Sequence, residues 1–306
     1  MIKFFKKIEI KKPVIICAWP GMGNVALGAV SYMRKKLKAA KFAEIKTRSL
    51  YMPNAVLVEN GVSVLPEVRE DLFYFSKNHN LVFFESATQA MGEEGLRAIA
   101  DILDMAKSLN ADKIFTGAAF PVPVGYEESP EVYGVVNQER MREMLVKFGV
   151  KIMEEGQIAG MNGLLLGYTG KKEIKGICLL ATIPLYAVGF SNPKASKAIL
   201  EVLEKMLGVE IDMAEMELDA REMEKKMKMI EENIKEIFPA IEKKTGTKID
   251  VDKSRVPNYV MKRIDKLFKE ARADRKKAHE LKQELDRWNL YDMYEDRFLD
   301  LFKDRQ

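Results

Sequence analysis

The chain has 306 residues, a formal net charge of +4, 47% hydrophobic residues and 31% charged residues. That length allows one large α/β domain or a domain with an appendage, and the composition is typical of a globular protein that buries a hydrophobic core. No apolar run approaches the roughly 20 residues that a membrane helix needs, and the basic first residues lack the apolar stretch of a signal peptide. We therefore expect a cytoplasmic protein with no membrane contact.

Cysteine and histidine usage argues against disulfide and metal chemistry. The chain has two cysteines and two histidines, too few for a disulfide framework and a poor set of metal ligands. Cys17 and Cys178 both lie in apolar, strand-like runs, where a free cysteine is most simply a small buried hydrophobe. We expect no metal site.

Residues 13–33 are the first organised segment. The β-branched run Val14 to Ile16 ends at Trp19-Pro20, and Gly21 and Gly23 precede a stretch with small and apolar residues at helical spacing. This order predicts a strand, a tight turn and a helix. In open α/β sheets, ligands and partners bind at this carboxyl end of the strands, where helix N-termini present unpaired N–H groups.

The rest of the first two thirds alternates strands and helices. A hairpin is predicted over 54–66, turning at Asn60-Gly61, and residues 66–76 fit a short helix or a strand. Residues 157–170 form a glycine-punctuated apolar segment. Strands are predicted over 43–50, 81–86, 112–120, 132–137 and 176–182, and helices over 92–109, 138–149 and 192–208. This alternation predicts a parallel or mixed sheet with helices on both faces, and the hairpin favours a mixed one.

The last third changes character, because apolar residues now repeat at alternating spacings of three and four. One seam runs from Met213 to Ile237, and a second runs from Val260 to Trp288 with a polar break at Asp274. Such seams indicate two long helices that form an antiparallel hairpin or an intersubunit bundle. The alternative is that each helix packs separately on the sheet domain.

Methionine is adaptable and is enriched on surfaces that must fit partners, although core packing is its commoner use. The residues expected to form oligomer or partner contacts are Met213, Met216, Met223, Met227, Ile230, Leu267, Leu281, Leu285 and Trp288. Residues 240–306 contain 18 basic and 14 acidic residues. The two signs are interspersed, which is typical of a solvated helix face, so we expect no nucleic-acid binding.

A second interpretation treats the first turn as a ligand site. Residues 21–26 satisfy G-x-G-x-x-A after a strand, the pattern of dinucleotide-binding turns. However, Glu44 lies near the start of the next strand, whereas a ribose-binding acid belongs at the carboxyl end. Glu85 could act as a general base there, or merely cap a turn, and no histidine lies nearby in the sequence. The alternative cleft consists of Gly21, Gly23, Asn24, Glu85 and Asn162, and neither a catalytic residue nor a cofactor is assigned.

Four stretches resemble the proteasome assembly chaperone family, in particular its second-subunit type with archaeal and bacterial homologues. They are WPGMGNVALGAVSYM, YMPNAVLVENG, VYGVVN and, most specifically, residues 158–212. The resemblance covers about residues 10 to 225. It implies a three-layer α/β/α sandwich with a mixed, mostly parallel sheet like that of nucleoside phosphorylases, a homo-oligomer, and a chaperone that binds proteasome subunits. Such chaperones often dock through a C-terminal tail with a hydrophobic residue and a tyrosine, which the ending LFKDRQ does not match.

Taken together, these features predict an α/β domain over 1–210 and a C-terminal helical extension over 211–306. The expected function is that of a non-enzymatic protein-assembly chaperone or adaptor that acts as a homo-oligomer, with proteasome subunits as the partners that the resemblance implies. The alternative is a small-molecule or nucleotide-binding enzyme that uses the cleft at the strand carboxyl ends.

Overall fold

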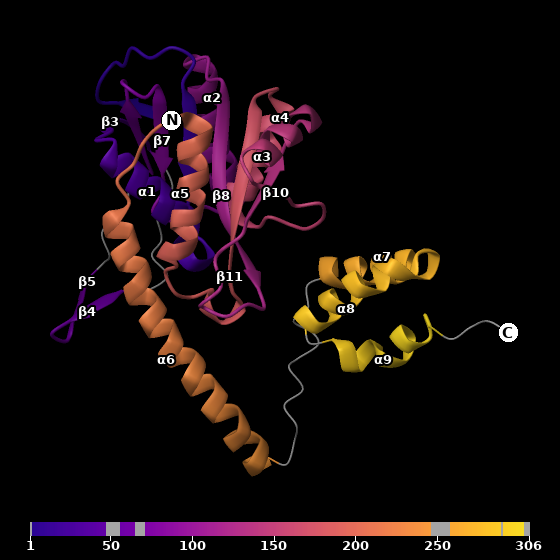
Figure 1. The fold of residues 1–306 in the computed structure, drawn as a ribbon. Coiled ribbons are helices and arrows are strands. Elements are labelled where there is room, and N and C mark those ends of the chain that lie inside the picture. Colours follow the sequence, from indigo (N-terminus) through magenta and orange to yellow (C-terminus); the bar gives the residue numbers. More distant parts are fainter. Residues whose placement is uncertain (1, 47–55, 65–70, 246–257, 289, 303–306) are drawn as a thin grey trace. The chain divides into compact units, whose positions relative to one another are not determined.

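The computed structural model describes residues 2–46, 56–64, 71–245, 258–288 and 290–302. The chain forms two compact units, residues 1–227 and residues 228–306. The first unit is an α/β domain and the second is helical (Figure 1). Within the described part of the chain, no helix has both the length and the hydrophobicity to cross a lipid bilayer.

The first unit is built on a nine-stranded sheet with the order β1-β3-β6-β7-β2-β8-β11-β9-β10. Parallel pairs are β7 with β2, β2 with β8, β8 with β11, and β9 with β10, and the other neighbours are antiparallel. The sheet is therefore mixed, as predicted, with its parallel pairing concentrated at the centre. The strands are Ile2–Phe4 (β1), Val14–Ala18 (β2), Ala40–Ile45 (β3), Asp71–Ser76 (β6), Leu81–Glu85 (β7), Lys113–Val122 (β8), Val132–Val136 (β9), Lys151–Ile152 (β10) and Lys175–Pro184 (β11).

Helices cover both faces of this sheet (Figure 1). Side chains alternate along β2, so that Ile16 packs with α1 (Val25–Lys36) and α5 (Pro193–Leu207), while Ile15 and Cys17 pack with α2 (Gly92–Ser108) and α4 (Gly160–Lys171). Because both faces of the central strands are buried, these strands are mainly apolar. The three-layer α/β/α architecture is confirmed.

Local sequence signals account for several element ends. The side chain of Asn192 accepts a hydrogen bond from the Ala195 N–H at 3.0 Å, and Gly208 ends α5 with a φ of 64°. The strand predicted over 43–50 begins earlier, as β3, and its last residues, 47–50, lie outside the described residues. The helix predicted over 138–149 is a 3-10 turn, Glu139–Met141, followed by α3 (Arg142–Lys147).

The predicted hairpin is confirmed by strands β4 (Leu57–Glu59) and β5 (Val62–Val64). Asn60 and Gly61 have φ angles of 51° and 81°, and two positive values in succession are typical of a type I′ turn. These strands form a two-stranded sheet of their own, separate from the nine-stranded sheet.

Helix α6 (Ala214–Thr245) begins in the first unit. Met216 lies in the α/β core, and Met213 packs against that core. Two ion pairs hold the same segment: Lys197 lies 3.1 Å from Glu217, and Lys194 lies 2.6 Å from Glu224. The predicted division after residue 210 falls close to the start of α6, whereas the compact units divide within this helix.

After the end of α6, the described part of the second unit contains the α-helices α7 (Asn258–Ala273), α8 (Ala278–Arg287) and α9 (Tyr291–Leu299). The prediction of a single long helix from Val260 to Trp288 is wrong, because the helix is interrupted at Asp274. This residue is extended, with a φ of −134°, and its carboxylate accepts a hydrogen bond from the Lys276 N–H at 3.0 Å. An aspartate is a preferred helix cap, so the polar interruption of the seam marks a helix boundary.

Candidate functional site

The turn after β2 brings two residues of the predicted cleft into unusual backbone conformations. Gly23 and Asn24 have φ angles of 61° and 48°. A Cβ atom on Gly23 would lie 3.1 Å from Val25 Cγ2, 3.2 Å from Ile183 Cδ1 and 3.3 Å from Asn192 Cβ. Glycine at position 23 is therefore explained by a left-handed backbone and by close packing.

Both backbone polar groups of Gly23 are bound to other parts of the chain. Its N–H donates to the Val188 carbonyl at 2.9 Å, and its carbonyl accepts from the Asn192 N–H at 2.7 Å. The Asn24 N–H donates to the Gly21 carbonyl at 2.9 Å. A phosphate cradle needs free N–H groups at this turn, and those of Gly23 and Asn24 are already used.

Asn162 binds the end of β2. Its Oδ1 accepts from the Trp19 N–H at 3.2 Å, and its Nδ2 donates to the Trp19 carbonyl at 3.3 Å. The Asn162 side chain is buried, with 4% of the residue exposed. Buried backbone groups need hydrogen-bond partners, and at the end of β2 this side-chain amide supplies the acceptor and the donor that a neighbouring strand would otherwise supply.

Gln89 makes a similar bridge beside it. Its side-chain Oε1 accepts from the Met161 N–H at 2.9 Å, which satisfies a donor in the first turn of α4. Its Nε2 donates to the Pro20 carbonyl. No local motif identifies Gln89, because both of its partners are distant in the sequence.

Glu85 pairs with a cation instead of facing an open cleft. Its Oε1 lies 2.6 Å from Arg34 Nε, and both side chains are largely buried. The Arg34 guanidinium also stacks over the Tyr74 ring, with its carbon 4.2 Å from the ring centroid. This arrangement is that of a structural ion pair and does not aim a base at a reacting proton.

Burial is the largest influence on the pKa of three other titratable groups, Asp71, Cys17 and Cys178. Burial raises the pKa of Asp71, the nearby Glu94 carboxylate acts in the same direction, and a hydrogen bond with Ser86 opposes them. Burial also raises the pKa of the Cys17 thiol and brings that of Cys178 to about 12. Buried thiols of this kind are poor nucleophiles.

The outer surface of the turn is apolar. Met22, Leu185, Val188 and Phe190, here called the turn surface, have between 39% and 45% of their area exposed. The hydrogen bonds of Gly23 to Val188 and Asn192 connect the segments that carry them. This surface was not predicted from the sequence, although the apolar run that follows β11 could have pointed to it. Grouped exposed hydrophobic residues are typical of a protein-binding surface.

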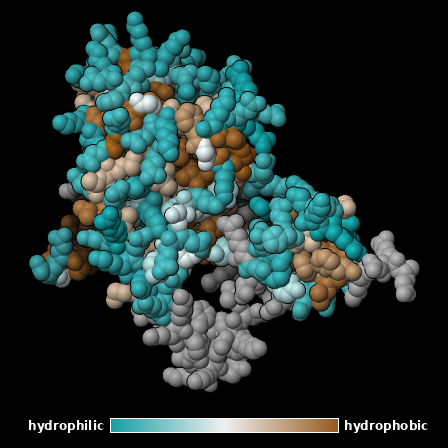
Figure 2. Space-filling model, in the orientation of Figure 1, coloured by the Kyte–Doolittle hydropathy of each residue, from teal (hydrophilic) through white to brown (hydrophobic). Residues whose placement is uncertain are grey.

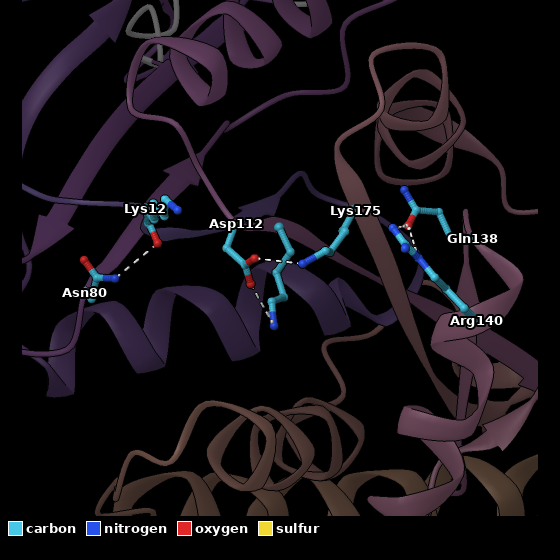
Figure 3. Close-up of polar contacts among 7 residues, drawn as sticks. Lys12, Asn80, Asp112, Gln138, Arg140 and Lys175 are labelled. Atoms are coloured by element: carbon cyan, nitrogen blue, oxygen red, sulfur yellow. Dashed lines mark hydrogen bonds and ion pairs between the residues drawn. The ribbon is translucent and has the colours of Figure 1, made fainter.

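The opposite end of these strands carries polar contacts, and the Asp112–Lys175 ion pair joins the starts of β8 and β11 (Figure 3). Asp112 lies between Lys175, at 2.9 Å, and Lys113, at 3.0 Å. Burial acts to raise the pKa of Asp112, but the two lysines outweigh it and hold this pKa below its usual range. Arg140 donates to the Gln138 side chain, and the Asn80 amide donates to the Lys12 carbonyl at 3.2 Å.

The C-terminal residues predicted to contact partners are found mainly in the cores of their own units. Met216 and Met227 are buried, whereas Met213, Met223 and Ile230 are half-buried. In the second unit, the contacts of α7, α8 and α9 bury Leu267, Leu281 and Leu285, and Trp288 packs against them. A role for these residues in partner contacts stays a prediction.

Of the five cleft residues, Gly21, Gly23, Asn24 and Asn162 therefore surround the end of β2, while Glu85 is bound to α1. Among the described residues, no group of three or more His, Cys, Asp or Glu side chains is placed to bind a metal ion.

Sequence comparison finds two curated relatives in Methanocaldococcus jannaschii. The uncharacterized protein MJ1210 is 26% identical over 214 residues, which cover 69% of this chain and 80% of the relative. The uncharacterized protein MJ0106 is 28% identical over 211 residues, covering 69% of this chain and 82% of the relative.

Solved structures share the fold. Pyrococcus furiosus PbaB, an archaeal proteasome activator, superposes with a TM-score of 0.65 and is 28% identical, covering 76% of this chain and 98% of PbaB. Pyrococcus furiosus PbaA, an archaeal homolog of proteasome-assembly chaperone, has a TM-score of 0.60 and 24% identity over 78% of this chain and 99% of PbaA. The model of the PAC2 family matches residues 15–231. The chain thus belongs to the PAC2 family.

Proposed function

We propose that this protein is a non-enzymatic, cytoplasmic assembly chaperone or adaptor that acts as a homo-oligomer and binds proteins, with proteasome subunits as the first partners to test. The observation that carries the proposal is the turn surface of Met22, Leu185, Val188 and Phe190. Membership of the PAC2 family and the similarity to PbaB support it.

The chemistry of the carboxyl edge favours protein binding over binding of a small anion. An anion site needs free N–H groups or unpaired cations, but Gly23 donates to Val188, and Arg34 is paired with Glu85. An exposed apolar surface gains free energy when another apolar surface covers it, at roughly 25 cal/mol for each Å² removed from water.

A hydroxyl–imidazole pair elsewhere in the domain does not provide a competing active site. Ser76 Oγ lies 2.8 Å from His79 Nδ1, across the tight turn between β6 and β7. Ser76 is buried, with 6% of the residue exposed. This contact is a hydrogen bond that stabilises the turn.

The test is a binding assay with recombinant proteasome α-subunits from the same organism, followed by native mass spectrometry and titration. The variant carries Leu185→Glu and Phe190→Glu, which place two charges on the turn surface. The matched control is Leu164→Glu on α4, because Leu164 is also about half exposed, at 50%, but lies outside the turn surface.

We expect the wild type and the control to bind equally and the double variant to bind at least about tenfold more weakly, as for loss of a central hydrophobic contact. Equal binding by all three proteins would contradict the role of the turn surface. Absence of binding by the wild type would contradict proteasome subunits as partners.

A further inference from the structure

The β4–β5 hairpin exposes an unusual amount of hydrophobic surface. Its five aliphatic side chains have between 40% and 70% of their area exposed: Val56, Leu57, Val58, Val62 and Val64. All six strand residues are exposed, and Figure 2 shows the hydrophobic colour of the hairpin at the lower left of the molecule. Exposed apolar groups this dense mark a surface that another surface covers.

Among the residues that the structure describes, no further strand pairs with the hairpin. It forms a separate two-stranded sheet, and a two-stranded ribbon by itself is marginally stable in water. Leu57 is paired with Val64, and Glu59 with Val62, so these side chains share one face, while Val58 lies on the other. Additional strands at the edge would extend the apolar face and stabilise the ribbon.

The outer edge of β5 is suited to pair with another strand. Across a two-residue turn, Glu59 and Val62 form a hydrogen-bonded pair, and pairs alternate along the ladder, so that Val58 and Ser63 form a non-hydrogen-bonded pair. The N–H and carbonyl of Ser63 therefore point away from β4, toward the outer edge of β5. Strand β5 contains no charged residue and no proline, which are the usual means of blocking an edge.

The charge pattern favours self-pairing through β5 over β4. The single charged residue of the two strands, Glu59, lies on β4. If two β4 strands paired antiparallel about Val58, each Glu59 carboxylate would lie beside Leu57 of the other copy. Pairing of β5 about Ser63 instead sets Val62 beside Val64 of the second copy and keeps the two Glu59 side chains on opposite outer strands.

We propose that β5 of one copy pairs antiparallel with β5 of a second copy about Ser63, joining the two hairpins into a four-stranded sheet. This interface rests on the homo-oligomer of the proposed function and specifies how two copies meet. The exchange of N–H···O bonds between the two Ser63 residues and the continuous apolar face formed by Leu57, Val62 and Val64 stabilise it.

The test uses the purified full chain alone, so its outcome is independent of any client protein. Ser63→Cys places two thiols directly opposite each other in the proposed sheet, where Cα atoms about 5.5 Å apart permit a disulfide. Val58→Cys is the matched control, because residue 58 is the cross-strand neighbour of Ser63 and is highly exposed. In the proposed sheet the two copies of residue 58 are three strand spacings apart, about 14 Å, beyond the reach of a disulfide.

Under mild oxidation we expect a disulfide-linked dimer of the Ser63→Cys protein and at least about tenfold slower cross-linking of the Val58→Cys protein. The native cysteines, Cys17 and Cys178, are buried and do not contribute. Absence of cross-linking at position 63, or equal rates at both positions, would overturn the proposal.

A second variant tests the interface without cross-linking. Ser63→Pro removes the outward N–H and leaves the hydrogen bonds between β4 and β5 intact, since Ser63 does not bond to β4. We expect the oligomer mass measured by native mass spectrometry to fall to that of the assembly in which this contact is absent, and the circular dichroism spectrum to stay unchanged. An unchanged native mass would overturn the proposal.

Discussion

Replacing Asn162 with alanine tests whether this residue serves the structure or a ligand. The substitution removes the amide that accepts from the Trp19 N–H and donates to the Trp19 carbonyl. Trp19 is buried and its indole packs on Phe84, with ring centroids 5.1 Å apart. The two backbone groups would thus lose their partners at a place where water does not easily replace them.

The expected loss of stability follows from these two groups. A buried donor or acceptor left without a partner costs about 1–3 kcal/mol, so Asn162→Ala should lower the free energy of unfolding by about 2–5 kcal/mol. At about 2–4 °C for each kcal/mol in a domain of this size, the melting temperature should fall by roughly 4–20 °C.

Urea denaturation followed by tryptophan fluorescence measures this change. The chain contains two tryptophans, Trp19 and Trp288, so a Trp288→Phe background leaves Trp19 to report on the α/β unit alone. Leu164→Ala on the same helix is the control, and because Leu164 is exposed we expect a change within about 0.5 kcal/mol. If Asn162→Ala unfolds at the same urea concentration as this control, the amide does not hold the end of β2, and a ligand-binding role regains support.

Three further substitutions test the site. Gly23→Ala gives a residue with a side chain a φ of 61° and places its Cβ against Ile183 and Val25. We therefore expect the free energy of unfolding, measured by heat or urea, to fall by about 2–3 kcal/mol, and wild-type stability would contradict this packing. Glu85→Ala leaves Arg34 largely buried without its carboxylate partner, so we expect the free energy of unfolding to fall by about 2–3 kcal/mol. The control is Glu93→Ala, because Glu93 pairs with Arg97 at an exposed site; there we expect a fall of less than about 0.5 kcal/mol. The raised pKa of Asp71 means that the folded state binds a proton more tightly than the unfolded state, so this carboxyl destabilises the fold increasingly as pH rises from its unfolded pKa through its folded pKa. Asp71→Asn should therefore stabilise the protein at pH 7 relative to wild type and lose that advantage in acid, and a gain that does not depend on pH would count against the assignment.

Much of the α/β fold was predictable because the decisive signals are local. The Asn60-Gly61 turn, the amphipathic helix α2 and the capped ends of α5 each depend on residues a few positions apart. The strands of the central sheet are continuous apolar runs for the same physical reason, since both of their faces are covered.

Other elements were not predictable, either because their own residues give no clear periodic signal or because their causes lie far away in the sequence. Helix α4 carries apolar side chains on more than one face and a glycine whose Cβ would lie 2.0 Å from the Ile158 carbonyl oxygen, so periodicity could not identify it. The direction of β9 against β11 depends on the path of the intervening chain and not on the composition of either strand.

For the candidate site, local motifs indicated the glycine turn but neither the contacts around it nor the turn surface. The glycine turn and Asn162 do meet at the end of β2, yet the partners of Gly23, Asn162 and Glu85 are Val188, Trp19 and Arg34, none of which a local motif identifies. Long-range contacts decide whether the N–H groups of a glycine turn are open to a ligand, and in this chain Val188 accepts the hydrogen bond of the Gly23 N–H.

The order of strands in the sheet has a consequence for synthesis on the ribosome. Strand β2 is made early, but its neighbours β7 and β8 are residues 81–85 and 113–122, and β8 in turn awaits β11 at residues 175–184. At about 5–20 residues per second, the nascent chain carries the apolar segment of β2 unpaired for several seconds. A protein proposed to assist the assembly of others thus passes through a stage in which its own central strand needs protection from aggregation.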